Sequence, residues 1–128
     1  MAPGSRPLSP HLSIYRFTLT MTMSIVHRAT GIALYGGTLL LVLWLLAAAI
    51  GGGFFDGVTW LFGSWLGQLV LFGYTWALFH HMFGGIRHFI WDFTQMMDPA
   101  GRELAVRLQL GASILLTLLV WAIFVWFK

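Results

Sequence analysis

The sequence contains no cysteine and very little charge. Without a thiolate, this chain cannot form a disulfide, hold an iron–sulfur cluster or bind zinc through sulfur, so a metal here must be bound by histidine or carboxylate. Only 9% of its 128 residues are charged, whereas 59% are hydrophobic. Such a composition indicates a membrane protein. The net charge of +3 comes from residues at the ends of apolar segments, which argues for membrane topology and against nucleic-acid binding.

Three long stretches carry no charged residue: 29–55, 57–86 and 108–127. A helix needs about 20 residues to cross the hydrocarbon core of a bilayer. The sequence therefore predicts an all-α fold, a three-helix integral membrane bundle in one domain (1–128), with spans at about 24–50, 60–88 and 105–127. The run LLLVLWLL before Ala47–Ala49 also resembles a signal peptide, but it is long and follows three arginines, which favours an uncleaved helix.

The arginines predict the orientation of the chain. Three precede the first charge-free stretch and three lie between the second and the third, whereas the segment GGGFFDG at the junction of the first two, interpreted as a loop, holds only Asp56. The six are Arg6, Arg16, Arg28, Arg87, Arg102 and Arg107. Because Lys and Arg near membrane ends stay in the cytoplasm or matrix, we expect the N-terminus inside and the C-terminus outside. Residues 1–22 should form an extended inner-side arm, because they contain three helix-breaking prolines.

Local signals also mark helix ends and packing surfaces. Asp98 followed by Pro99 predicts a helix N-terminus at the third span. Small residues at Ala29, Ala33 and Gly37 allow close helix approach, either within this chain or against a second subunit. Tryptophans near span ends are typical of an aromatic belt: Trp60, Trp91, Trp121 and Trp126.

Ionisable side chains gather at the predicted inner ends of the first two spans. Such groups cost roughly 2.5–3.5 kcal/mol each at the centre of a membrane helix on insertion scales, so each needs a reason. Ser24, His27 and Arg28 have i, i+3, i+4 spacing and share one helix face. On the second span, counting residues along parallel helices places His88 level with His27, and His81 about 10 Å deeper.

The second span also offers a flat strip beside a histidine. His81 and His88 lie within about 20° of each other around the helix, and Gly84 and Gly85 fall between them. A planar haem can lie on such a strip with its iron on His81, and its propionates can then reach His27, Arg28 and His88.

Simpler interpretations remain open for these residues. The glycine pair can be a helix-packing notch, and a membrane histidine can be a hydrogen-bonded packing residue. Arg28 and Arg87 can be anchors that extend to the interface. His80 and Arg87 form a competing stripe, and the spacing to Gly85 favours His81 over His80 only weakly.

A haem with two histidine ligands would need a second imidazole at the depth of His81. By residue counting, His27 and His88 lie about 10 Å too shallow, His80 points elsewhere and His11 lies outside the membrane. The second ligand is therefore expected from another chain, with the haem shared between subunits.

Three segments together resemble a known family. These are RPLSPHLSIYR (Arg6–Arg16), SIVHRATG (Ser24–Gly31) and HMFGGIRHFIWD (His81–Asp92). In this order, with three spans, they resemble the cytochrome b subunits of the succinate dehydrogenase membrane anchor, in respiratory complex II. The resemblance implies a second three-helix anchor subunit, an iron–sulfur subunit and a flavoprotein on the inner face, and haem b between the two anchor chains.

The resemblance also implies roles for individual residues. The histidine seven positions before the last residue of GIRH is the family's haem ligand, which here is His81. His27, Arg28 and His88 match positions near the haem propionates. Ser24 and Arg28 match the ubiquinone pocket, which the iron–sulfur subunit and a tyrosine of the other anchor chain complete. Asp92 matches an acidic position near that pocket and, four residues after His88, can also orient its imidazole.

The expected function is therefore that of a membrane-anchor subunit of succinate:quinone oxidoreductase, in the tricarboxylic acid cycle and respiratory chain, with no flavin or succinate site of its own. The alternatives are a haem b anchor of a quinol:fumarate reductase and a haem-free structural anchor. An initial Met without an Arg- and Ser-rich transit stretch favours a bacterial inner membrane over a mitochondrial one.

Overall fold

The computed structural model describes residues 15–127, which form four helices and contain no strand. The helices are α1 (Leu19–Ile50), α2 (Gly52–Gly63), α3 (Trp65–Asp92) and α4 (Pro99–Trp126). Three of them, α1, α3 and α4, are long and apolar enough to cross a membrane. For the described residues, the prediction of an all-α fold with three helices of membrane-spanning length is confirmed.

The first helix begins earlier than the sequence suggested. Thr18 caps α1, because its side-chain oxygen accepts a hydrogen bond from the Met21 amide at 3.3 Å. The predicted arm (1–22) therefore already turns helical at Leu19, since its prolines lie too far upstream to interrupt this helix. The part of the arm up to Ile14, with Arg6 and His11, lies outside the described residues.

The expected loop GGGFFDG between the first two spans is mostly helical. Gly51 and Gly52 have φ of 73° and 57°, a conformation that glycine adopts without strain, and they separate α1 from α2. The helix α2 then continues to Gly63. The next residue, Ser64, caps α3, because its hydroxyl oxygen accepts a hydrogen bond from the Gly67 amide at 3.1 Å. The second span therefore starts at Trp65, and Trp60 is an exposed residue of α2.

The start of α4 follows the predicted cap. The Asp98 carboxylate accepts a hydrogen bond from the Gly101 amide at 3.0 Å, and Pro99 occupies the first turn. This confirms the helix signal, although α4 begins before the predicted span at residue 105.

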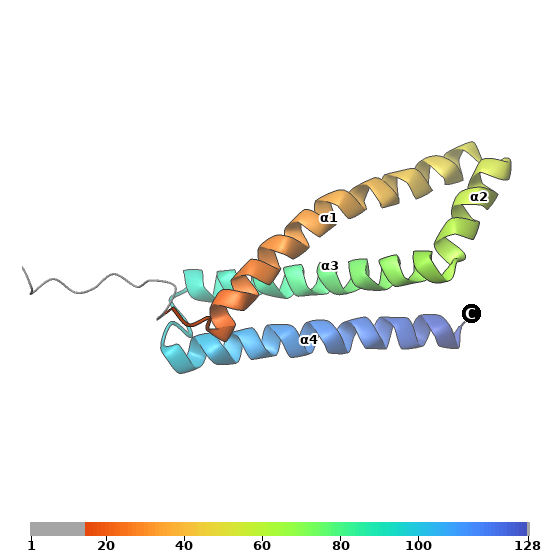
Figure 1. Ribbon diagram of the computed structural model, residues 1–128. Helices are drawn as coiled ribbons and strands as arrows, with labels where there is room; N and C mark the ends of the chain where they lie inside the picture. Colours follow the sequence, from red (N-terminus) through yellow and green to blue (C-terminus); the bar gives the residue numbers. More distant parts are fainter. Residues whose placement is uncertain (1–14, 128) are drawn as a thin grey trace, which may run out of the picture.

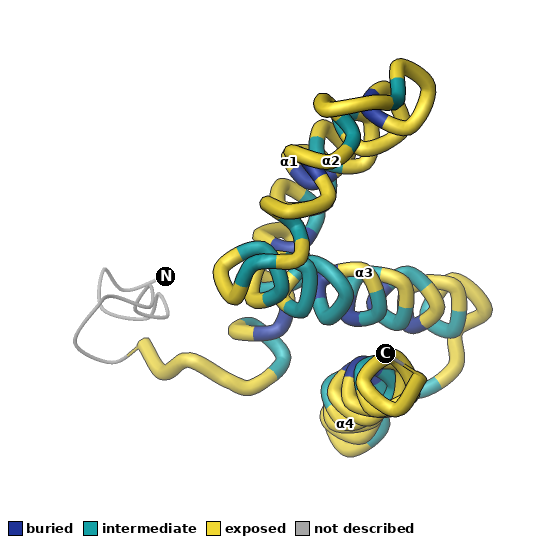
Figure 2. The backbone as a smooth tube through the Cα atoms, turned by 90° about the vertical axis from the view of Figure 1, so that its right-hand side faces the viewer, coloured by how far each residue is buried: buried dark blue, intermediate teal, exposed yellow. Residues whose placement is uncertain are grey.

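The long helices meet at one end of the molecule. α3 and α4 run side by side, whereas α1 crosses them near the start of α4 and diverges toward α2 (Figure 1). Viewed along the bundle, most of the chain is exposed, and α3 lies between α1 and α4 (Figure 2). The crossing brings the polar start of α1 against the polar end of α3.

The interior of this bundle is unusually polar. The buried polar side chains are Thr30, His80, Arg87, Gln109, Ser113 and Thr117, while large hydrophobic side chains cover the surface. In lipid, burying small and polar groups between helices is favourable, because outward-facing hydrophobic residues meet acyl chains. The chain therefore has the inside-out polarity of a membrane bundle.

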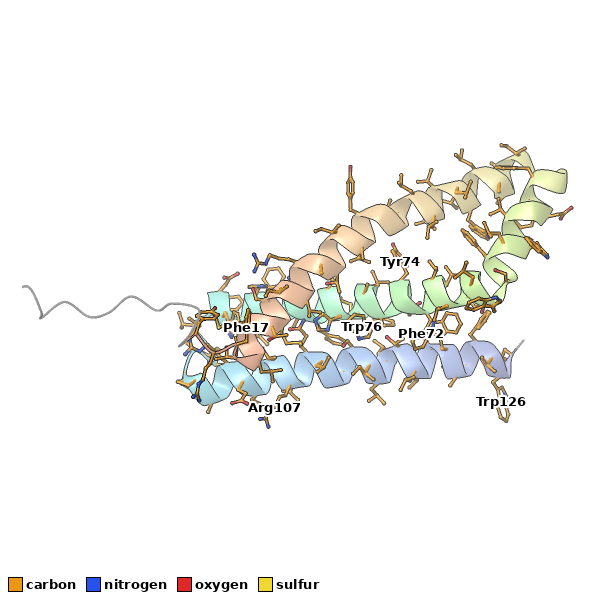
Figure 3. The ribbon with its side chains drawn as sticks, in the orientation of Figure 1. Phe17, Phe72, Tyr74, Trp76, Arg107 and Trp126 are labelled. Carbon is orange, nitrogen blue, oxygen red and sulfur yellow. The ribbon has the colours of Figure 1, made fainter. Side chains whose placement is uncertain are left out.

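The small-residue stripe on the first helix is only partly used within the chain. Gly37 is buried, and a Cβ at this position would overlap the Tyr74 ring, which lies between α1 and α3 (Figure 3). Ala29 and Ala33 are exposed. Packing inside the chain thus accounts for Gly37, and the other two positions remain accessible to a second subunit.

Candidate functional site

His27 of α1 and His81 of α3 form a reciprocal pair where the helices cross. Their rings stack with centroids 4.1 Å apart and planes at 6°. The His27 Nε2–H donates to the His81 carbonyl oxygen (3.2 Å), and the His81 Nδ1–H donates to the His27 carbonyl oxygen (3.1 Å). Because a carbonyl oxygen can only accept, each of these ring nitrogens must carry a proton.

This arrangement corrects the depth predicted for His27. Residue counting placed His27 about 10 Å from the level of His81, but that estimate assumed parallel helices. Since α1 crosses α3, His27 lies beside His81 and also has its ring centroid 5.5 Å from that of His88. His27 is nevertheless unsuited to share a metal with His81, because stacked rings present their faces to each other while two axial ligands point their nitrogens at one atom.

The glycine strip is also only partly as predicted. A Cβ on Gly84 would overlap the His27 ring, so this glycine is the notch that receives His27 and is not open to a planar ligand. A Cβ on Gly85, in contrast, would meet no atom within 4 Å. The packing-notch alternative therefore applies to Gly84, and the flat-strip interpretation can apply only to Gly85.

His80, the neighbour of His81, holds α3 to α4. Its side chain is fully buried, near Trp76, which faces α4 (Figure 3). The His80 Nδ1 lies 3.3 Å from the Ser113 hydroxyl oxygen. The Gln109 amide nitrogen donates to His80 Nε2 at 3.0 Å and also to the His80 carbonyl at 3.0 Å. Both ring nitrogens are therefore occupied by protein groups.

His81 differs from His80 in the nitrogen that it leaves available. With its proton on Nδ1, neutral His81 carries its lone pair on Nε2, and Nε2 has no hydrogen-bond partner among the described residues. Residues 15–127 contain no group of three or more His, Asp or Glu side chains that could bind a bare metal ion. The donor set thus suits a metal held mainly by another group, with a single imidazole from this chain.

Arg87 is buried and does not extend to the interface. Its side chain is 3% exposed, and its guanidinium carbon lies 4.7 Å from the centroid of the Trp91 ring, a cation–π contact. It forms no ion pair within the described part of the chain. The interpretation of Arg87 as an interfacial anchor is therefore wrong.

The other predicted site residues lie on the surface near the helix crossing. Ser24, Arg28, His88 and Asp92 are all exposed. The Arg28 Nε donates to the Ser24 carbonyl at 3.4 Å, so these two residues stay together on α1. The His88 ring packs edge-on to Trp91, and no hydrogen bond in the described residues joins Asp92 to His88. The structure therefore does not support the idea that Asp92 orients this imidazole.

Sequence reasoning overlooked four polar residues of this region. Gln109, Ser113 and Thr117 recur every four positions along α4, a spacing that could have revealed one polar face directed at His80. Thr30 is 4% exposed and contacts His81. Nothing in its local sequence distinguishes it from other threonines, because the contact depends on the helix crossing.

Comparison with known proteins identifies the family. The sequence model of the succinate dehydrogenase/fumarate reductase transmembrane subunit matches residues 3–126. The chain belongs to this family. Within it, the chain is 37% identical over 121 residues to the succinate dehydrogenase cytochrome b556 subunit of Paracoccus denitrificans, covering 94% of this chain and 93% of the relative.

Two cytochrome b560 subunits of succinate dehydrogenase are also similar to this chain. The cytochrome b560 subunit of Reclinomonas americana is 34% identical over 125 residues, 94% of this chain and 87% of that protein. The mitochondrial cytochrome b560 subunit of Sus scrofa is 44% identical over 93 residues, 70% of this chain and 54% of that protein. The chain is therefore a multi-pass membrane member of a family that includes bacterial and mitochondrial proteins.

Proposed function

We propose that this chain is the membrane-anchor cytochrome b subunit of a succinate:quinone oxidoreductase. The observation that carries the proposal is the contact of His81 Nδ1 with the His27 carbonyl oxygen, which places the proton on Nδ1 and leaves Nε2 for a metal, on a chain whose relatives are named cytochrome b. The family also includes fumarate reductase subunits. We favour succinate oxidation, because the compared relatives are succinate dehydrogenase subunits.

His81 would hold the iron of haem b through Nε2. Haem, when bound, supplies a site that accepts and returns one electron near the quinone. His27 cannot be the second ligand, because its ring stacks on His81 and its Nε2–H is bonded to a carbonyl. The second imidazole would come from the other anchor subunit. A purified complex should give a pyridine haemochrome spectrum of haem b, and this chain purified alone should lack a bis-histidine spectrum.

Arg28 and His88 would hold the haem propionates. Arg28 and His88 are exposed close to His27 and can donate charge-assisted hydrogen bonds to carboxylates. His27 has its Nε2–H committed to the His81 carbonyl, so its Nδ1 could donate to a propionate only with both ring nitrogens protonated.

Ser24 and Arg28 would form this chain's part of the quinone pocket, with Asp92 near its edge. Both residues lie exposed on the first turns of α1, as a pocket completed by the iron–sulfur subunit requires. The Ser24 hydroxyl can donate to a quinone carbonyl, and the Arg28 guanidinium can stabilise negative charge as the quinone is reduced. Electrons would come from the iron–sulfur subunit, since this chain has no cysteine.

We further propose that the N-terminus lies inside and the C-terminus outside, in a bacterial inner membrane. The arginines near the starts of α1 and α4 support this orientation. The flavoprotein and iron–sulfur subunits would then dock on the inner face, beside Ser24 and Arg28.

Replacing Arg28 with leucine should separate the two activities of the complex. Succinate:quinone reductase activity should fall at least about tenfold, because charge stabilisation at the quinone is lost. Succinate oxidation with a soluble acceptor should stay unchanged. Arg107→Leu serves as control, since Arg107 pairs with Glu103 on the exposed side of α4. An equal loss of both activities in Arg28→Leu would contradict the assignment.

A further inference from the structure

Thr30 contacts both members of the histidine pair. Its hydroxyl donates to the His27 carbonyl oxygen at 2.8 Å, and the same oxygen lies 3.3 Å from His81 Nδ1. Because the only hydroxyl proton is used on the carbonyl, the Thr30 oxygen faces His81 with a lone pair. It therefore accepts from the Nδ1–H of His81.

The His81 Nδ1–H consequently has two acceptors on α1. One is the His27 carbonyl at 3.1 Å and the other is Thr30 Oγ1 at 3.3 Å. Two acceptors on one proton fix both the tautomer and the rotation of the ring about its Cβ–Cγ bond. The ring also fills the space left by the missing side chain of Gly31, since a Cβ there would lie only 3.0 Å from His81 Cε1.

A local role for the hydroxyl does not account for this contact. Thr38, on the same helix, donates to the carbonyl of Leu34 at 2.9 Å, yet Thr38 is exposed and contacts no histidine. Thr30 instead belongs to the buried stripe of α1, with Met23 and Gly37 seven residues to either side. Its hydroxyl is thus held at the α1–α3 contact.

We propose that Thr30 is a positioning residue for the axial histidine, setting the orientation and basicity of His81. Acceptors on the outer nitrogen of a metal-bound imidazole fix the ring and increase its electron donation to the metal. Greater donation stabilises ferric iron and lowers the haem reduction potential. This inference rests on the proposed function, because it presumes that His81 binds haem iron.

The test compares Thr30→Val with Thr30→Ser and Thr38→Val in the whole purified complex. Valine keeps the branched shape and removes the hydroxyl, serine keeps the hydroxyl, and Thr38→Val removes a hydroxyl that contacts no histidine. We expect Thr30→Val to raise the haem midpoint potential and shift the low-spin ferric EPR g values, or to lose haem. Thr30→Ser and Thr38→Val should match the wild-type complex.

The haem content of the wild-type complex is measured first. This measurement distinguishes a failure of the proposed haem-binding function from a failure of the role proposed for Thr30. A wild-type complex without haem overturns both. A haem-loaded wild type with an unchanged potential and EPR signal in Thr30→Val overturns only the role of Thr30. An equal shift in Thr38→Val also overturns it, since the effect would then be general to α1. If Thr30→Val does not assemble, the smaller Thr30→Ala is judged by the same readouts.

Discussion

Substituting alanine for Gly84 should disrupt the α1–α3 crossing and with it the assembled complex. The added Cβ overlaps the His27 ring and lies 3.0 Å from the Gln109 amide nitrogen. Neither neighbour can yield freely, because the His27 ring is stacked on His81 and bonded to its carbonyl, and Gln109 is bonded to His80. Overpacking of this kind costs about 1–3 kcal/mol or more.

The matched control for Gly84→Ala is Gly73→Ala, on the same helix. Nothing lies within 4 Å of a Cβ at Gly73, and alanine favours a helix over glycine by roughly 1 kcal/mol. We expect Gly84→Ala to lower both the thermal unfolding midpoint and the haem content of the purified complex. Gly73→Ala should lower neither of them. Equal behaviour of the two variants would show that the helices do not pack as described.

The two adjacent histidines should give opposite results when each is replaced by alanine. His81→Ala removes the proposed iron ligand, so the complex should lose the low-spin bis-histidine spectrum or the haem itself. His80→Ala should keep the spectral type of the haem, because both nitrogens of His80 are bonded to α4. It should instead destabilise the α3–α4 contact by about 1–3 kcal/mol, since the buried Gln109 and Ser113 lose a partner.

Optical and EPR spectra measure the first effect, and thermal unfolding of the purified complex measures the second. If His80→Ala abolished the low-spin signal while His81→Ala kept it, the two roles would have to be exchanged. Thr117→Val provides a control for the stability measurement. Within residues 15–127 its hydroxyl bonds only to the carbonyl of Ser113 on its own helix, so the α3–α4 contact should survive.

Several features of the fold could be predicted because they depend on neighbouring residues alone. The length of the apolar stretches gave three spans, and Asp98–Pro99 gave the start of α4. The helix α2 was missed because GGGFFDG looks like a loop by composition. Of the glycines in this segment, only Gly51 and Gly52 have positive φ. The residues after them continue as helix.

The histidine cluster shows where local reasoning stopped. The spacing of His27, His81 and His88 correctly indicated one polar region, but the predicted depths came from residue counts along parallel helices. A crossing angle cannot be read from one helix at a time, because it depends on which small residues let two helices approach. Gly84 and Gly31 permit the approach here, and they place residues 54 positions apart in direct contact.

The sequence by itself determined that the chain is a membrane protein with three apolar helices and a small set of polar groups near one end, since hydrophobic length and charge are properties of the residues themselves. Only the tertiary structure decided how those groups are used. The His27 ring covers Gly84, and both ring nitrogens of His80 are hydrogen-bonded to α4. Nε2 of His81 stays available, because Thr30 and the His27 carbonyl bind its Nδ1–H. Hydrogen bonds between helices distinguish the two histidines, and such bonds exist only after the helices have packed.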